Sequence, residues 1–146
     1  MDGVALISLR QFFDERGSVM HFLRSDAPHF KAFGEIYFST VFPGKVKAWH
    51  SHTRKTVNLA VPVGQMRLVL FDGRSQGETS GELIEVILSP SNYQLLSISP
   101  GVWYGFQCLS AVPAFMANCA TEPYEPAEGR TLPHDTSQIP YRWPRT

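Results

Sequence analysis

The sequence lacks several features that mark secreted and membrane proteins. Cys108 and Cys119 are its only cysteines in 146 residues, so no disulfide framework is indicated. Both have apolar neighbours, which favours buried free thiols, although pairing between adjacent strands stays open. No apolar run approaches the roughly 20 residues of a membrane-spanning helix. We therefore expect no membrane partner.

An excess of charge of one sign is also absent. Thirteen lysines and arginines balance 13 aspartates and glutamates, so the formal net charge is +0. This balance removes any global argument for a nucleic-acid partner. A local basic cluster remains, which is either a solvated strand edge or an anion site; it consists of Lys45, Lys47, Arg54 and Lys55.

Helical periodicity is not sustained in any window of 11 or more residues. Short segments rich in β-branched and aromatic residues alternate with turns rich in Gly, Pro, Asn and Ser. This pattern indicates an all-β sandwich or closed barrel. The expected strands cover residues 4–9, 35–42, 45–49, 57–63, 65–71, 83–88, 93–98, 103–108 and 113–120, and a charged turn is expected at 13–17.

The length and the hydrophobic fraction of 43% suit one globular domain over residues 1–146. The composition changes at Thr121, since the segment 121–146 holds five of the eleven prolines. Its apolar side chains nevertheless predict that this segment packs back on the barrel; they are Tyr124, Leu132, Ile139, Tyr141 and Trp143. The first residues lack the pattern of a signal peptide, so we expect a cytoplasmic protein.

Two histidines, His50 and His52, lie in the stretch 43–72, which is mostly of strand character. If residues 49–53 are extended, both imidazoles share one face of the strand with Ala48 and Arg54. Three interpretations stay open: a pair of metal ligands, a proton-transfer site, or two surface histidines without a shared function.

The metal interpretation depends on spacing. The segment 44–64 contains a glycine, five residues, His-x-His and a later glycine, as in the first metal-binding motif of the cupins, which are small double-stranded β-helix barrels. Thr56 or Val57 stands where that motif has a glutamate, and Tyr104 stands where the second motif has a histidine. Two of four ligands are therefore missing, and a site would need another carboxylate such as Glu35. We assign no metal ligand.

The proton-transfer interpretation fits histidine chemistry better. Imidazole moves protons near neutral pH, and it is usually oriented by an acceptor on its second nitrogen. Asp135 could orient His50 if the C-terminal segment folds over the barrel mouth. Tyr104 and Tyr37 could serve as acids. The alternative is that His50 merely lines the barrel and is satisfied by hydrogen bonds.

Five segments occur in an order that is informative together. They are FFDERGSVMHF, VKAWHSH, VGQMRLVLFDGR, GELIEVILSPSNYQLLSISPGVWYGFQCLS and YEPAEGRTLPHDTSQIPYRW. Over nearly the whole chain they resemble the dTDP-4-dehydrorhamnose 3,5-epimerase family, the sugar-nucleotide epimerases of the cupin superfamily. This resemblance implies a cupin-type double-stranded β-helix, or jelly-roll barrel, that forms a homodimer. It implies a nucleotide-diphosphate sugar as ligand, dTDP-linked and with a 4-keto-6-deoxysugar. No cofactor is expected.

The resemblance also implies residue roles. The family's base falls on His50 and its orienting aspartate on Asp135. The diphosphate contacts fall on Arg16 and Arg74, and Phe12 falls near the nucleobase, on an N-terminal segment that reaches the neighbouring subunit's site in such dimers. The arginine before the base becomes Lys47.

Three departures from the family pattern bear on the reaction. Asn118 stands at the position of the family's tyrosine acid, and Tyr104 stands at that of a late histidine. The family's lysine aligns near Thr56, so Lys55 is on a shifted register and would face the other way. We therefore expect epimerisation at one carbon rather than two, or a keto–enol isomerisation, with His52 or Tyr104 as the proton donor. The rival hypotheses are a non-catalytic protein that binds sugar nucleotides or carbohydrate, and a metal-dependent cupin enzyme.

Overall fold

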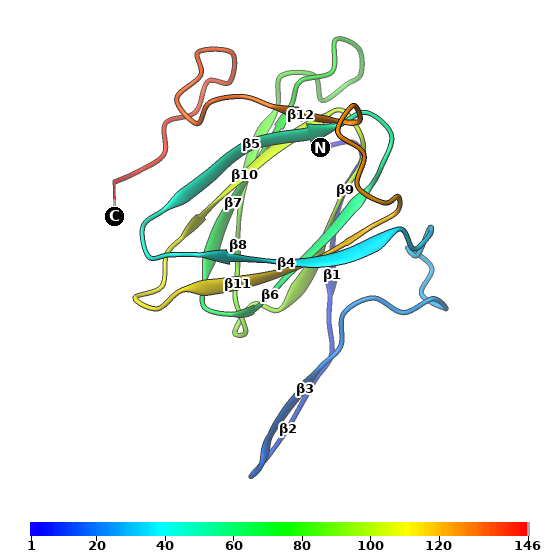
Figure 1. The fold of residues 1–146 in the computed structure, drawn as a ribbon, viewed down its shortest axis with the longest axis vertical. Helices are drawn as coiled ribbons and strands as arrows, with labels where there is room; N and C mark the ends of the chain where they lie inside the picture. The colour runs from blue at the N-terminus through cyan, green and yellow to red at the C-terminus, as the bar shows by residue number, and fades with distance from the viewer. Residues whose placement is uncertain (146) are drawn as a thin grey trace.

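The computed structural model describes residues 1–145, which contain twelve strands and no helix (Figure 1). The strands are β1 (Val4–Ser8), β2 (Gln11–Asp14), β3 (Gly17–Met20), β4 (Glu35–Val41), β5 (Val46–His52), β6 (Val57–Val63), β7 (Met66–Asp72), β8 (Leu83–Leu88), β9 (Gln94–Ile98), β10 (Val102–Cys108), β11 (Ala114–Ala120) and β12 (Gly129–Thr131). The all-β prediction is confirmed. The strand expected at 45–49 is longer than predicted, because β5 continues through both histidines.

Two five-stranded antiparallel sheets form the barrel (Figure 1). One has the order β1-β9-β6-β11-β4, and the other has the order β12-β5-β10-β7-β8. Neighbours in each sheet are mostly distant in sequence, which is the connectivity of a jelly roll rather than of a simple meander. The predicted cupin-type jelly roll is the observed architecture.

The inner faces of the sheets enclose the main hydrophobic core. Alternate residues of each strand point inward, and the largest of these are fully buried. Each such side chain stabilises the fold by about 1.5–3 kcal/mol through removal from water. Core residues include Leu59, Val61, Met66, Leu68, Leu70, Leu96, Ile98, Val102, Phe106 and Met116. At one end of β5 and β10 the inward positions become polar, and there the barrel is hollow.

The C-terminal segment lies against the outer face of the second sheet. Its strand β12 pairs with β5, with Thr131 opposite His50. Farther on, Ile139 packs with Trp49 and Val69 in a second buried cluster, and Trp143 lies beside Trp49 at a ring-centroid distance of 5.2 Å. This segment therefore covers the edge of β5, which would otherwise expose unpaired backbone groups.

The hairpin of β2 and β3 projects away from the barrel (Figure 1). The charged turn expected at 13–17 is its tip, where Arg16 forms an ion pair with Asp14 at 2.6 Å. Phe12 and Phe13 are exposed on the hairpin. The side chains of the hairpin are thus free to contact another molecule rather than their own barrel.

Both cysteines are free and buried, as the sequence favoured. No helix in residues 1–145 is long and apolar enough to cross a membrane.

Candidate active site

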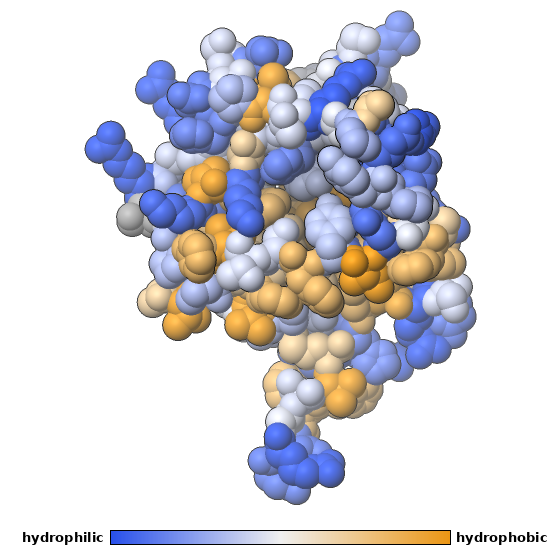
Figure 2. Space-filling view, viewed as in Figure 1, coloured by the Kyte–Doolittle hydropathy of each residue, from blue (hydrophilic) through white to orange (hydrophobic). Residues whose placement is uncertain are grey.

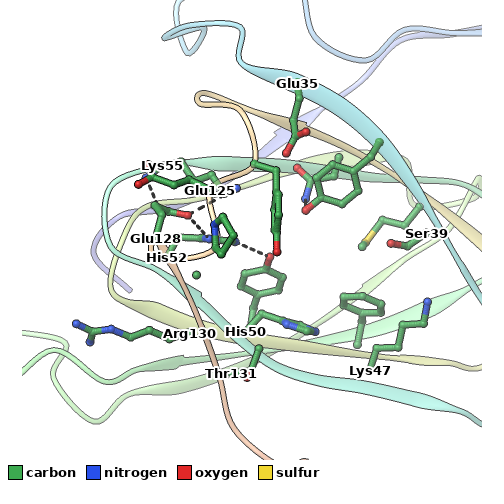
Figure 3. Close-up of a pocket in the computed structure, with 18 residues that line it drawn as sticks. Glu35, Ser39, Lys47, His50, His52, Lys55, Glu125, Glu128, Arg130 and Thr131 are labelled. Carbon is green, nitrogen blue, oxygen red and sulfur yellow. Dashed lines mark hydrogen bonds and ion pairs between the residues drawn. The ribbon is translucent and has the colours of Figure 1, made fainter.

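A cavity of about 660 Å³ opens between the two sheets at the polar end of the barrel (Figure 3). One wall comes from β5, β10 and β12, and the facing wall comes from β4 and β11. The segment 124–131 closes a third side. The cavity is lined by Glu35, Tyr37, Ser39, Lys47, His50, His52, Lys55, Tyr104, Phe106, Met116, Asn118, Tyr124, Glu125, Pro126, Glu128, Gly129, Arg130 and Thr131.

A bulge in β5 brings Lys47 onto the histidine wall. Tyr104 of β10 pairs with His50, but Phe106 pairs with Lys47, so two steps along β10 match three along β5. Strict alternation would have placed Ala48 beside the histidines. Instead Ala48 packs with Trp49 in the outer cluster, and Lys47 lines the cavity. The prediction that Ala48 shares the histidine face is wrong for this reason.

His52 is held from both of its ring nitrogens. Its Nδ1 lies 2.9 Å from Oε2 of Glu128, and its Nε2 lies 3.1 Å from the hydroxyl of Tyr104 (Figure 3). Glu128 is anchored in turn, because its Oε1 accepts the backbone N–H groups of Thr53, Arg54 and Lys55 at 3.0–3.1 Å. The carboxylate therefore fixes both the imidazole and the turn that follows β5.

The charge states of this network follow from burial and hydrogen bonding. Burial raises the pKa of Glu128, but the backbone donors of Arg54 and Lys55 and the His52 imidazole outweigh it and lower that pKa to about 2. Burial lowers the pKa of His52, and the nearby carboxylate only partly offsets this. Burial raises the pKa of Tyr104 far above its usual range. A consistent arrangement is a neutral His52 that donates from Nδ1 to Glu128 and accepts the Tyr104 proton at Nε2.

His50 is placed differently. Its ring lies between those of Tyr104 and Phe106, with centroid distances of 5.8 and 6.3 Å, and it faces the cavity. Within residues 1–145, no hydrogen bond joins its ring to another group. Burial lowers its pKa, and the electrostatic influences of the neighbouring His52 and Lys47 act in the same direction. His50 is therefore an unprotonated imidazole at neutral pH whose nitrogen is free to take a proton.

Lys47→Met is expected to raise the pKa of His50. Removal of a nearby positive charge favours the imidazolium, so the base form is lost at a higher pH as the solution is acidified. An NMR titration of the His50 ring protons measures this directly. Lys45→Met, an exposed position just before β5, is the control and should leave the titration unchanged. An unaltered titration in Lys47→Met would contradict the assigned influence of Lys47.

The facing wall contributes a tyrosine and an asparagine. Tyr37 and Asn118 are directly paired across β4 and β11, and the Asn118 Nδ2 donates to the Tyr37 hydroxyl at 2.6 Å. Asn118 is only 2% exposed, and its Oδ1 has no partner among the described residues. Glu35 points into the cavity from the start of β4 (Figure 3). The cavity thus has polar groups on both of its long sides.

The structure brings together five of the nine residues proposed from the sequence. These are His50, His52, Tyr104, Lys47 and Asn118. Arg74 lies outside the cavity lining, where its guanidinium is bound by Asp72 at 2.6 Å. Phe12 and Arg16 lie on the projecting hairpin, so a contact with this kind of site would require a neighbouring copy.

Asp135 does not orient His50 in this structure. It is exposed and lines a separate hollow formed by the C-terminal segment 134–145. The prediction assumed that this segment folds over the barrel mouth. It runs instead along the outer face of the second sheet after β12. The carboxylate that contacts a histidine of the cavity is Glu128, and its partner is His52 rather than His50.

The sequence did not point to Glu128 as a site residue, and it wrongly excluded Lys55. Lys55 was expected to face away, but it is 3% exposed and its Nζ lies 3.6 Å from Oε2 of Glu128, which is 1% exposed. The basic cluster is not one site: Arg54 binds Glu122 and Glu125, and Lys45 is exposed. Glu128 does fall in the YEPAEG segment, but nothing local relates it to His52.

The residue set does not favour a metal centre. In the part of the chain that the structure describes, no group of three or more His, Cys, Asp or Glu side chains is arranged to hold a metal ion. Both nitrogens of His52 are already bonded to protein groups.

Comparisons with known proteins agree with the fold. The chain resembles a crystal structure of a dTDP sugar isomerase from Desulfovibrio desulfuricans G20, with 48% sequence identity, coverage of 97% of this chain and 91% of that one, and a TM-score of 0.95. It is 30% identical over 145 residues to the spore coat polysaccharide biosynthesis protein SpsL of Bacillus subtilis (strain 168), which is 98% of this chain and 96% of SpsL.

A third similarity is to a structure with a bound sugar nucleotide. This is the dTDP-6-deoxy-D-glucose-3,5-epimerase RmlC from Legionella pneumophila Philadelphia 1, in complex with dTDP-4-keto-L-rhamnose; it is 25% identical, with a TM-score of 0.86 and coverage of 100% of this chain and 81% of that one. The dTDP-4-dehydrorhamnose 3,5-epimerase family model matches residues 1–146. The protein accordingly belongs to the dTDP-4-dehydrorhamnose 3,5-epimerase family.

Proposed function

We propose that this protein is an epimerase or isomerase of a nucleotide-linked 4-keto-6-deoxysugar, and that it acts at one carbon rather than two. The observation that carries the proposal is His50. It is a half-buried imidazole with a lowered pKa and a free ring nitrogen, and it faces a cavity large enough for a sugar. A general base of this kind suits proton abstraction from a carbon next to a ketone.

The reaction begins when His50 takes the proton from that carbon. The electron pair left behind moves into the ketone and forms an enolate, whose oxygen needs a cation or hydrogen-bond donor. Lys47 and Lys55 supply ammonium groups in the cavity lining. Return of a proton to the carbon restores the ketone, so no oxidant, reductant or cofactor is consumed.

The nucleotide-sugar assignment follows the bound ligand of the similar RmlC structure, which is a dTDP-linked keto-sugar. Support within this chain comes from two cations at the cavity, Lys47 and Arg130, both exposed enough to meet a diphosphate. Arginine and lysine side chains are the usual partners of phosphate oxygens. We propose that the nucleotide is of the dTDP type.

A homodimer is part of the proposal. The outer face of β4 and β11 exposes a set of large apolar side chains, which includes Ile36, Phe38 and Phe115. Figure 2 shows apolar surface on the lower half of the body and on the part of the projecting hairpin nearest to it, whereas the tip of the hairpin is hydrophilic. Burial of such a patch against a second copy would be favourable. It would also let Phe12 and Arg16 meet a neighbouring cavity.

We propose a cytoplasmic location for the same reaction. A nucleotide diphosphate is multiply charged and does not cross membranes unaided, so the enzyme acts where its substrate is made. The two free thiols, Cys108 and Cys119, suit a reducing compartment.

Incubation with a dTDP-4-keto-6-deoxysugar in D₂O tests the function. We expect uptake of one deuteron at one carbon next to the ketone, followed by NMR, together with a product changed at that carbon. Two deuterons at two carbons would show a double epimerase. Binding without exchange across a panel of keto-sugar nucleotides would overturn the enzyme in favour of a binding protein. Activity that is lost with chelator and restored by one metal would favour the metal-dependent alternative.

A further inference from the structure

We propose that Tyr37 is a catalytic acid that protonates the substrate from the wall opposite His50, and that Asn118 is the positioning residue for its hydroxyl. This inference rests on the proposed epimerase function and assigns the second half of the reaction. The sequence analysis named Tyr37 among the possible acids but favoured His52 or Tyr104 as the donor, so the assignment of Tyr37 departs from that preference.

The geometry separates the two roles by sheet. His50 projects into the cavity from β5, in one sheet, whereas Tyr37 projects from β4, in the facing sheet. A sugar ring in the cavity would therefore meet an imidazole on one side and a phenol on the other. Inversion at carbon needs this arrangement, because the proton must leave from one face and return to the opposite one.

The hydrogen bond from Asn118 leaves the Tyr37 proton available. Since Asn118 Nδ2 donates to the phenol oxygen, the O–H of Tyr37 is not used in that contact. Partial burial and the charges of Glu35 and Glu128 raise the pKa of Tyr37, so it carries its proton at neutral pH. Once that proton has been given away, the same amide N–H stabilises the phenolate.

Tyr104 and His52 are less suited to this step. Both belong to the wall that carries His50, and the Tyr104 hydroxyl is engaged with His52 Nε2, which lies 3.1 Å away. A proton from either group would return to the face from which His50 removed one. That outcome exchanges the hydrogen but does not invert the carbon.

The protons and electrons balance without a further reactant. The C–H bond breaks, an N–H bond forms on His50, and the electron pair forms the enolate. The enolate carbon then takes the proton of Tyr37 on its other face, the ketone is restored, and a phenolate remains. The imidazolium proton then returns to the phenolate through solvent. His50 and Tyr37 thereby regain their starting protonation states, and no cofactor is needed.

Tyr37→Phe tests the assignment by separating exchange from inversion. We expect the variant to wash deuterium into the substrate through His50 with retained configuration, while formation of the inverted product falls about 10²–10⁴-fold. Tyr141→Phe, in the outer cluster away from the cavity, is the matched control and should keep both rates. Inverted product at the wild-type rate would refute the proposal, and so would equal loss of exchange and inversion. A wild-type enzyme with neither activity would instead defeat the proposed function.

Asn118→Ala tests the positioning role. We expect a higher ratio of exchange to inversion than in the wild type, because an unanchored phenol delivers its proton less often. This ratio does not depend on the folded fraction of the sample, so a purely structural effect leaves it unchanged. An unchanged ratio would remove Asn118 from the mechanism.

Discussion

His50→Asn is expected to abolish substrate-dependent deuterium uptake, with a fall of about 10²–10⁴-fold or more. Asparagine fills much of the same volume but cannot accept a proton from carbon, so enolate formation loses its base. NMR of the keto-sugar in D₂O measures the uptake directly. The uncatalysed exchange, measured in a sample without enzyme, is subtracted. Inversion should fall in parallel, because it requires the same enolate.

The matched control is His134→Asn, an exposed histidine in the C-terminal segment outside the cavity. It should retain wild-type exchange. If His50→Asn also retained wild-type exchange, another group would be the base, and His52 would be the first to consider. The present geometry argues against His52, since both of its nitrogens are engaged.

Glu128→Ala is expected to destabilise the fold by about 3–5 kcal/mol. The substitution leaves the buried ammonium of Lys55 without its counter-ion, and it deprives three backbone N–H groups of their shared acceptor. Urea unfolding measures the loss as a shift of the transition midpoint between the variant and the wild type, provided that both have the same dependence of unfolding free energy on urea. The residual folded protein should also have lower activity, because His52 is no longer held.

Glu125→Ala on the same loop is the control. Glu125 is exposed and its carboxylate pairs with the exposed guanidinium of Arg54, at 2.6 Å, so its removal should cost far less stability than that of Glu128. Similar losses in both variants would contradict the special role of Glu128. Acidification gives an independent check. The Glu128 carboxylate contributes to the free energy of unfolding above its ordinary pKa of 4.5, and this contribution is lost as the pH falls towards about 2. The Glu128→Ala variant should not show this part of the acid-dependent loss.

The barrel strands could be predicted well because the sequence patterns that mark strands and turns are local. Alternation of apolar and polar residues and the spacing of turns located nine barrel strands, with errors of a few residues at their ends. The same alternation correctly placed His50 and His52 on one face of β5. Neither inference needed knowledge of which strands become neighbours.

The details of the site were harder to predict because they depend on contacts between distant segments. The bulge that turns Lys47 inward is one extra residue in β5, and no change in hydrophobic pattern marks it. Glu128 lies 76 residues from His52 and belongs to a loop without periodicity. Asp135 was proposed from histidine chemistry and from the family resemblance, but the path of the chain after β12 carries it to the outside.

The pairing of β12 with β5 also has a consequence for biosynthesis. During translation, both histidines and the eleven strands from β1 to β11 are synthesised before Glu128, so these strands are made before the residue that completes the histidine wall. A nascent chain that ends short of residue 128 could bury most of the core yet would leave His52 without its carboxylate and β5 with an open edge. The histidine wall would thus be completed only after strands β1 to β11 have been synthesised, and a molecule cut before residue 128 would present the open edge of β5 to other chains.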